Sequence, residues 1–242
     1  MTSFLDVEFE TAFQLGNSWE SEIIQTAMGY PPNERKEKSD MDAKDYFDDA
    51  ADTWDDRFIT SSLLFFLDKF VPQFGIEAGQ KVLDVGTGTG VLIPYLVKAV
   101  GPSGSVTAID FSEKMVQACK TKHSHFRNVS IRVGNIEDDN FPAQSFDAVI
   151  CFGIFPHIEN KEKALRNINN MLKPGGRLVV AHALSSKELE VHHKRFSEHV
   201  AHPVMLREAE MRESLERAGF AGIRIRDEPG CYCCISDKRN RL

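Results

Sequence analysis

Three glycines at alternate positions follow a short apolar segment that contains one acid. Asp84 lies in the segment VLDV, and Gly86, Gly88 and Gly90 come directly after it. Glycine lets the backbone approach a ligand closely, and a helix that begins behind such a turn offers unpaired N–H groups to that ligand. Residues 82 to 90 therefore predict a site for a nucleotide-sized molecule.

A second acid stands twenty residues after the last of these glycines. Asp110 ends the apolar segment SVTAID, which we predict to be the next strand. A carboxylate in that position can accept hydrogen bonds from both hydroxyl groups of a ribose. Nicotinamide-binding sheets show G-x-G-x-x-G rather than the G-x-G-x-G of this chain. A nicotinamide-dependent oxidoreductase, which would bind NAD, is therefore the less favoured alternative.

Two histidines are placed where a reacting group would be needed. His157 follows the strand predicted at 146–151, and His182 ends the strand predicted at 177–182. Ligands of open α/β sheets collect beyond the carboxyl ends of the strands. An imidazole in that place can act as a base near neutral pH, and the alternative for each histidine is a hydrogen bond to a loop.

Five of the eight histidines lie between residues 182 and 202, among them His192 and His193. Three interpretations stay open: ligands for a transition metal or a metallated substrate, a cover that contacts a substrate, or a solvated helix face. No HExxH or equivalent pattern occurs, so we predict no dedicated metal site. His193 is retained as a third catalytic candidate beside the two histidines above.

Alternating strands and helices must position these residues. The strands are predicted at 80–85, 105–110, 129–133, 146–151, 177–182, 222–227 and 231–236, with helices between all but the last two. This order implies right-handed crossovers and helices on both faces of the sheet. The turn Pro229-Gly230 leaves no room for a helix, so the last strand should be antiparallel. We predict an α/β fold with a doubly wound, seven-stranded, mostly parallel sheet and an antiparallel last strand.

Individual residues mark the ends of several helices. Pro72 should end or kink the helix predicted over 61–74. Residues 174–176, Pro-Gly-Gly, follow another helix and should form a turn with a purely structural role. Ser185 with Glu188 three residues later is a capping box, which predicts the start of the helix that carries the paired histidines.

The first 40 residues differ in character from the rest. The charged run NERKEKSD has nothing to bury and reads as a linker. Residues 1–40 are therefore predicted to be an N-terminal appendage, either a docking arm or a lid, and residues 41–242 one domain. A helix predicted over 43–58, with Asp42 as its N-cap, carries Tyr46 and Trp54 on one side, where they would help to close the site.

Charge and composition narrow the class of partner. The net charge of -7 argues against a nucleic-acid partner, because affinity for the phosphate backbone comes from clustered Lys and Arg. No basic leader occurs, and no apolar run approaches the ~20 residues of a membrane span. We therefore expect a cytoplasmic protein with no membrane partner. The odd set of cysteines fits a reducing compartment, and it comprises Cys119, Cys151, Cys231, Cys233 and Cys234.

Five segments together resemble the class I S-adenosylmethionine-dependent methyltransferases, and among them the UbiE-like small-molecule branch. They are LDVGTGTG, AIDFSEKMV, VGNIED, SFDAVICF and MLKPGGRLVV, and the resemblance covers about residues 42 to 237. It implies a Rossmann-like methyltransferase fold and methyl transfer from S-adenosylmethionine to a small-molecule acceptor, with S-adenosylhomocysteine as the product.

The resemblance also assigns the cofactor-binding residues. Asp84 would reach the amino group of the cofactor and Asp110 its ribose, while Phe111 and Ile136 would flank the adenine. Asn135 stands where the family often has Asp, and its amide would meet the adenine amino group. Packing in the core is the alternative for the apolar residues. The full set implied is Tyr46, Trp54, Asp84, Gly86, Thr87, Gly88, Gly90, Asp110, Phe111, Met115, Asn135 and Ile136.

The acceptor is not defined by these motifs. The segment AHALSSKELEVHHKR also resembles a subgroup of these enzymes associated with corrinoid proteins, so a corrinoid-protein partner carrying the acceptor stays open. The D/N-P-P-Y/F motif of nucleic-acid N-methylation, the Asp pair of catechol-type enzymes and the cysteine cluster of radical enzymes are absent. The alternative function is a non-catalytic S-adenosylmethionine-binding sensor or partner subunit.

Overall fold

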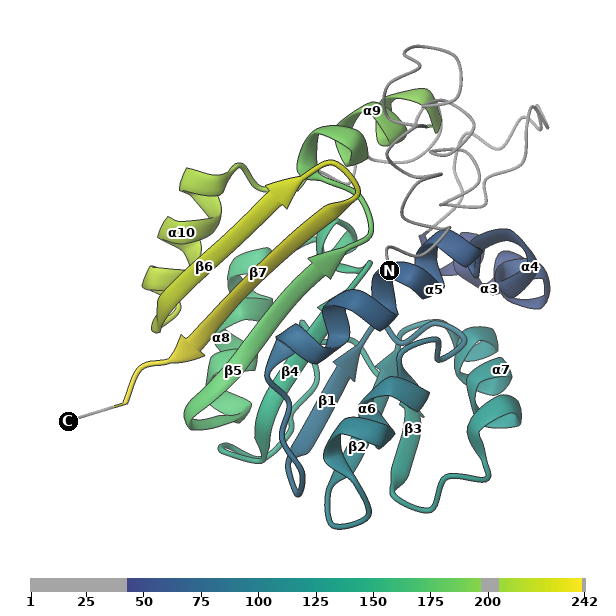
Figure 1. Cartoon of the computed structure of the whole chain (residues 1–242), viewed down its shortest axis with the longest axis horizontal. Helices are drawn as coiled ribbons and strands as arrows, with labels where there is room; N and C mark the ends of the chain where they lie inside the picture. Colours follow the sequence, from purple (N-terminus) through teal and green to yellow (C-terminus); the bar gives the residue numbers. More distant parts are fainter. Residues whose placement is uncertain (1–42, 197–204, 241–242) are drawn as a thin grey trace, which may run out of the picture.

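The computed structural model describes residues 43–196 and 205–240, and the side chains of these residues except 192–196. Their strands form one seven-stranded sheet in the order β3-β2-β1-β4-β5-β7-β6 (Figure 1). The strands are β1 Lys81–Val85, β2 Ser105–Asp110, β3 Val129–Val133, β4 Phe146–Phe152, β5 Leu172–His182, β6 Phe220–Glu228 and β7 Cys231–Lys238. The first four lie within one residue of their predicted bounds.

The sheet is parallel except at β7. Strands β3, β2, β1, β4 and β5 pair in parallel, whereas β7 pairs antiparallel with both β5 and β6. Gly230 has a φ of 73°, which suits the tight turn between β6 and β7. The predicted fold class and its antiparallel last strand are thus confirmed. The antiparallel strand lies inside the sheet, and β6 forms the edge.

Helices cover both faces of the sheet, because side chains alternate in direction along each strand. On β5, Val179 faces the cluster formed with α5 and α6, and Val180 faces the cluster formed with α8 and α10. Both valines are fully buried. The helices named are α5 Ser61–Phe70, α6 Ile93–Val100, α8 Lys161–Met171 and α10 Glu208–Arg217. None of the helices in the described part combines the length and apolarity of a membrane crossing.

The predicted helix over 43–58 is interrupted. It consists of α3 Ala43–Ala50, the 3-10 turn η1 Ala51–Thr53 and α4 Trp54–Phe58. The backbone of Thr53 leaves the helical region at φ −111° and ψ 4°, and its hydroxyl donates to the carbonyl of Ala50. This break lets α3 and α4 pack at the carboxyl ends of the strands, where α3 and η1 contact α7 Glu113–His123.

Two of the three helix-end predictions agree with the structure. Helix α5 gives way to a 3-10 turn, η2 Val71–Phe74, at Pro72. The capping box before α9 Ser186–Phe196 is present, since Ser185 Oγ accepts from Glu188 N at 3.2 Å and Glu188 Oε2 accepts from Ser185 N at 2.7 Å. The Pro-Gly-Gly segment differs from the prediction, as it forms an irregularity inside β5 where Gly175 has a φ of 72°.

Candidate active site

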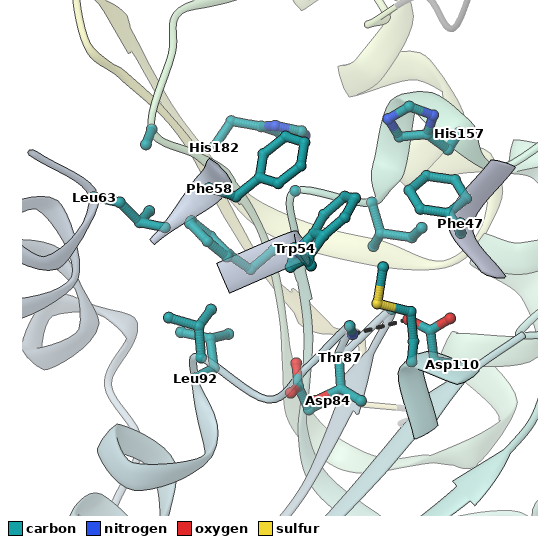
Figure 2. A pocket seen from close by; sticks show the side chains of 18 of the residues that line it. Phe47, Trp54, Phe58, Leu63, Asp84, Thr87, Leu92, Asp110, His157 and His182 are labelled. Atoms are coloured by element: carbon teal, nitrogen blue, oxygen red, sulfur yellow. Dashed lines mark hydrogen bonds between the residues drawn. The ribbon is translucent and has the colours of Figure 1, made fainter. Parts of the chain in front are cut away.

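A cavity opens at the carboxyl ends of the central strands, beneath α4 and α5 (Figure 2). Asp84, Thr87 and Asp110 lie at one end of the view, and Phe58 and His182 lie at the other. The indole of Trp54 stands between the two groups. We call the end with the two acids the cofactor side and the end with His182 the acceptor side, following the roles implied by the sequence.

The glycine loop after β1 has a shape that only small residues allow. Gly86 has a φ of 69°, and a Cβ added there would lie 2.5 Å from Cγ1 of Ile154. The amides of Gly86 and Thr87 donate to the carbonyl of Ile109 at 2.8 and 3.0 Å. The loop is therefore fixed against the end of β2, and its backbone forms part of the cavity wall.

Asp110 ties two loops together on the cofactor side. Its Oδ2 accepts a hydrogen bond from the amide of Gly88 at 2.8 Å, drawn dashed in Figure 2, and its Oδ1 accepts one from the amide of Ser112 at 2.9 Å. The residue is only 6% exposed, and burial raises the pKa of its carboxyl. A buried carboxylate that both shapes the loops and lines the cavity suits the ribose-binding role implied by the sequence.

Asp84 is a buried acid whose second oxygen has no hydrogen-bond partner in the described part of the chain. Its side chain is 1% exposed and its Oδ2 is the unpartnered atom. Burial above all, with a contribution from the charge of Asp110, raises the pKa of Asp84 to about 7, although the Thr87 hydroxyl opposes this. A carboxylate in this state on a cavity wall fits a cationic ligand group such as an ammonium.

The adenine-binding candidates line an adjoining cavity. Phe111, Asn135 and Ile136 are on its wall together with Lys44 from α3. Asn135 is oriented by its own loop, because its Oδ1 accepts from the amide of Glu137 at 2.9 Å. Ile136 also packs in the hydrophobic core, so this residue both lines the cavity and contributes to core packing. The glycine cradle, the unpartnered acid and the apolar side chains of Phe111 and Ile136 beside Asn135 fit S-adenosylmethionine.

Some predicted site residues lie elsewhere. Gly90, with a φ of 93°, packs against the His123 ring, from which an added Cβ would be 2.5 Å away, and it does not line either cavity. The Tyr46 ring meets the edge of Phe47 at a centroid distance of 5.3 Å and likewise lies outside both linings. His193 belongs to α9, but its side chain is outside the described part. His199 and His202 are also outside it.

The other two catalytic candidates, His157 and His182, both line the first cavity. His182 ends β5, is 2% exposed and stands opposite Tyr232 of β7. His157 is in the 3-10 turn η3 Phe155–His157, and its ring meets the Phe47 ring edge-on, with the ring centroids 5.6 Å apart.

The thiol of Cys151 is fully buried and burial strongly raises its pKa, so it is not a nucleophile. In the described part, no group of His, Cys, Asp and Glu could hold a metal ion.

Sequence reasoning missed most of the acceptor side. The wall of the cavity comes from separate segments, and the apolar lining residues that sequence reasoning missed include Phe58, Leu63, Phe152, Ala183 and Leu189. The rings of Trp54 and Phe58 stack with centroids 3.9 Å apart. The sequence gives one indication of this wall: Trp54 and Phe58 are four residues apart, and side chains at that spacing on a helix are neighbours.

The comparisons with known proteins agree with this geometry. Residues 76–219 match a family model described as a methyltransferase domain, which is more than half of the chain. The chain therefore belongs to this methyltransferase family. Demethylmenaquinone methyltransferase of Staphylococcus aureus is 41% identical over 112 residues, which are 46% of each chain. The chain spans about half the length of the curated relatives that it matches.

Solved structures extend the likeness over about 70% of the chain. A S-adenosylmethionine-dependent methyltransferase from Aquifex aeolicus is 28% identical with a TM-score of 0.56, over 70% of this chain and 88% of that one. One from Mesorhizobium loti is 17% identical with a TM-score of 0.58, over 71% and 100% of the chains, which shows the fold alone. The predicted enzyme class is confirmed, because the chain contains a methyltransferase domain and shares its fold with S-adenosylmethionine-dependent methyltransferases, whose cofactor the residues of this site fit.

The predicted contact between Asp84 and the cofactor ammonium has a pH signature. The cofactor-free protein should hold a proton on Asp84 below about pH 7, and an ammonium favours the carboxylate, so cofactor binding must displace that proton. Affinity for S-adenosylhomocysteine should rise about tenfold from about pH 6 to about pH 8. Calorimetric titration across this range measures the rise. The Asp84→Asn variant should bind weakly at every pH, and an equally steep rise in that variant would contradict the assignment.

Proposed function

We propose that this methyltransferase moves the methyl group by direct displacement to a small, uncharged acceptor. The observation that carries the proposal is the composition of the acceptor side. Among the described residues it is lined by apolar and aromatic side chains, and its polar groups are the imidazoles of His157 and His182. Burying a charged acceptor group without a counter-charge costs several kcal/mol, so carboxylate and phosphate acceptors are disfavoured.

The relatives suggest which uncharged acceptors to consider first. The matching Staphylococcus aureus enzyme is named for demethylmenaquinone, so quinol-type rings are the first acceptors to test. The stacked rings of Trp54 and Phe58 supply a flat apolar wall, and aromatic rings pack favourably on such a surface. These features support a flat, hydroxylated ring as the acceptor.

In this proposal the chain aligns the acceptor and receives its proton. S-adenosylmethionine supplies an electrophilic methyl carbon whose bond to sulfur breaks as the new bond forms, leaving the electron pair on sulfur. The apolar wall excludes water and holds the acceptor in line, which lowers the entropic part of the barrier. His182 takes the proton that the acceptor gives up, because its imidazole lies on the acceptor side of the cavity (Figure 2).

A panel of acceptors tests the proposal. Purified protein is incubated with S-adenosylmethionine and, separately, with hydroquinones, simple phenols, amino acids, phosphorylated metabolites and a reduced corrinoid, and S-adenosylhomocysteine is measured by mass spectrometry. Turnover should occur with uncharged hydroxylated rings. Turnover restricted to the charged acceptors would contradict the proposal, and turnover with the corrinoid would assign a partner-bound acceptor. Tight cofactor binding without turnover on any of them favours the non-catalytic sensor.

A further inference from the structure

Residues 43–58 contact both loops of the cofactor side through two carboxylates. We call this segment the N-terminal cover; it comprises α3, η1 and α4. It also supplies Phe47 and Trp54 to the cavity wall, where a Cβ added at Gly88 would lie 3.8 Å from Nε1 of the indole. The cover therefore lies directly over the glycine loop and the end of β2.

Asp48 is the first of the two carboxylates. Its Oδ1 accepts hydrogen bonds from Ser112 Oγ at 2.5 Å and from the amide of Lys114 at 3.2 Å, and its Oδ2 pairs with Lys44 at 2.7 Å. Although burial opposes ionisation, these hydrogen bonds lower the pKa of Asp48 to about 2. The Ser112 amide in turn donates to Asp110, so one chain of hydrogen bonds joins the cover to the acid assigned to the ribose.

Asp55 is the second carboxylate, on the other side of the cover. Its Oδ1 accepts a hydrogen bond from Thr89 Oγ1 at 2.5 Å, and its Oδ2 forms an ion pair with Lys122 of α7. Thr89 stands between Gly88 and Gly90 in the glycine loop. The two acids thus contact the two loops that line the cofactor side, one acid on each loop.

We infer that Asp48 and Asp55 are positioning residues that fasten the N-terminal cover onto the cofactor loops, so that the cofactor is released only when these contacts open. The inference rests on the proposed placement of the cofactor between these loops. Each carboxylate holds its loop and the cover in one arrangement, and hydrogen bonds to ionised groups are about twice as strong as neutral ones. Removing the charge should leave the sheet intact while the cover opens more often.

Release kinetics test this inference. In a Trp19→Phe background, Trp54 is the one remaining tryptophan of the chain, and its fluorescence reports binding. Asp48→Asn and Asp55→Asn should each release S-adenosylhomocysteine about tenfold faster in stopped-flow displacement, with no slower association. Thr89→Val should resemble Asp55→Asn, and the double variant should be no faster than either, because both changes remove the same contact.

Neighbouring acids provide matched controls. Asp52→Asn and Asp56→Asn make the same change in charge on exposed positions of η1 and α4, and they should release the ligand at the wild-type rate. Circular dichroism and thermal unfolding without ligand check that each variant is folded. Wild-type release rates in folded Asp48→Asn and Asp55→Asn proteins would overturn the inference while leaving the cofactor site intact. If the wild-type protein does not bind S-adenosylhomocysteine, the placement of the cofactor is wrong and the inference fails with it.

Discussion

Replacing Asp110 by alanine should weaken the binding of S-adenosylhomocysteine by a factor of at least about 100. The variant loses a buried carboxylate that is assigned to both ribose hydroxyls. It also leaves the amides of Gly88 and Ser112 without their acceptor, so the two loops lose the contact that sets their spacing. Isothermal titration calorimetry with the purified protein measures the affinity.

Asp147 supplies a matched control for this experiment. It is also an acid of a central strand that anchors its surroundings, since it accepts from the amide of Lys81 at 2.8 Å and from Lys173 Nζ at 2.6 Å. It lies away from the cavity linings. Asp147→Ala should lower thermal stability without changing affinity. Loss of a single hydrogen bond to a charged group should already lower the affinity by more than about threefold. If Asp110→Ala binds S-adenosylhomocysteine within about threefold of the wild-type affinity, the ribose assignment is refuted.

Replacing His182 by glutamine should lower kcat by about 10²- to 10⁴-fold once an acceptor is known. Glutamine keeps a polar side chain at this buried position but cannot accept a proton from the acceptor at neutral pH. The affinity for S-adenosylhomocysteine should stay within about twofold of the wild type, because only an interaction made in the transition state is removed. Steady-state kinetics and calorimetry separate the two effects.

His157→Gln is the comparison that assigns the base. His157 lines the same cavity, and it also lines the cavity with the adenine-binding candidates. We therefore expect its substitution to change cofactor affinity more than kcat. A large loss of kcat in His157→Gln with little loss in His182→Gln would transfer the role of base to His157. Wild-type kcat in both variants would show that neither of these two histidines is the base.

The sheet could be predicted because its strands are buried and bounded by turn residues. The segments VLDV and SVTAID are apolar runs that end at glycine or at an acid, and their bounds agree closely with β1 and β2. The sequence predicts a start at residue 177 for β5, which begins at Leu172, because Pro-Gly-Gly is typical of a turn. In the structure the positive φ of Gly175 lets the strand continue past an irregularity, which local sequence cannot distinguish from a turn.

The two sides of the site differ in how far the sequence reveals them. The acids and glycines of the cofactor side are placed by strand ends that the sequence predicts. Leu63 and Leu189 of the acceptor side sit in separate helices, and in the sequence they look like any core leucine. Asp48 and Asp55 look like acids on a solvated helix face, and their roles depend on partners more than 30 residues away.

The position of β7 has a consequence for how the protein is assembled. Strands β1 to β4 follow one another in the sequence and pair among themselves. Strand β5 pairs with β4 on one side, and its other neighbour is β7, the segment Cys231–Lys238, which is synthesised last. During synthesis on the ribosome, the nascent chain would therefore expose β5 as an unprotected edge that is apolar on both faces. Chains that stop before residue 231 should aggregate, even though they contain every residue assigned to the cofactor.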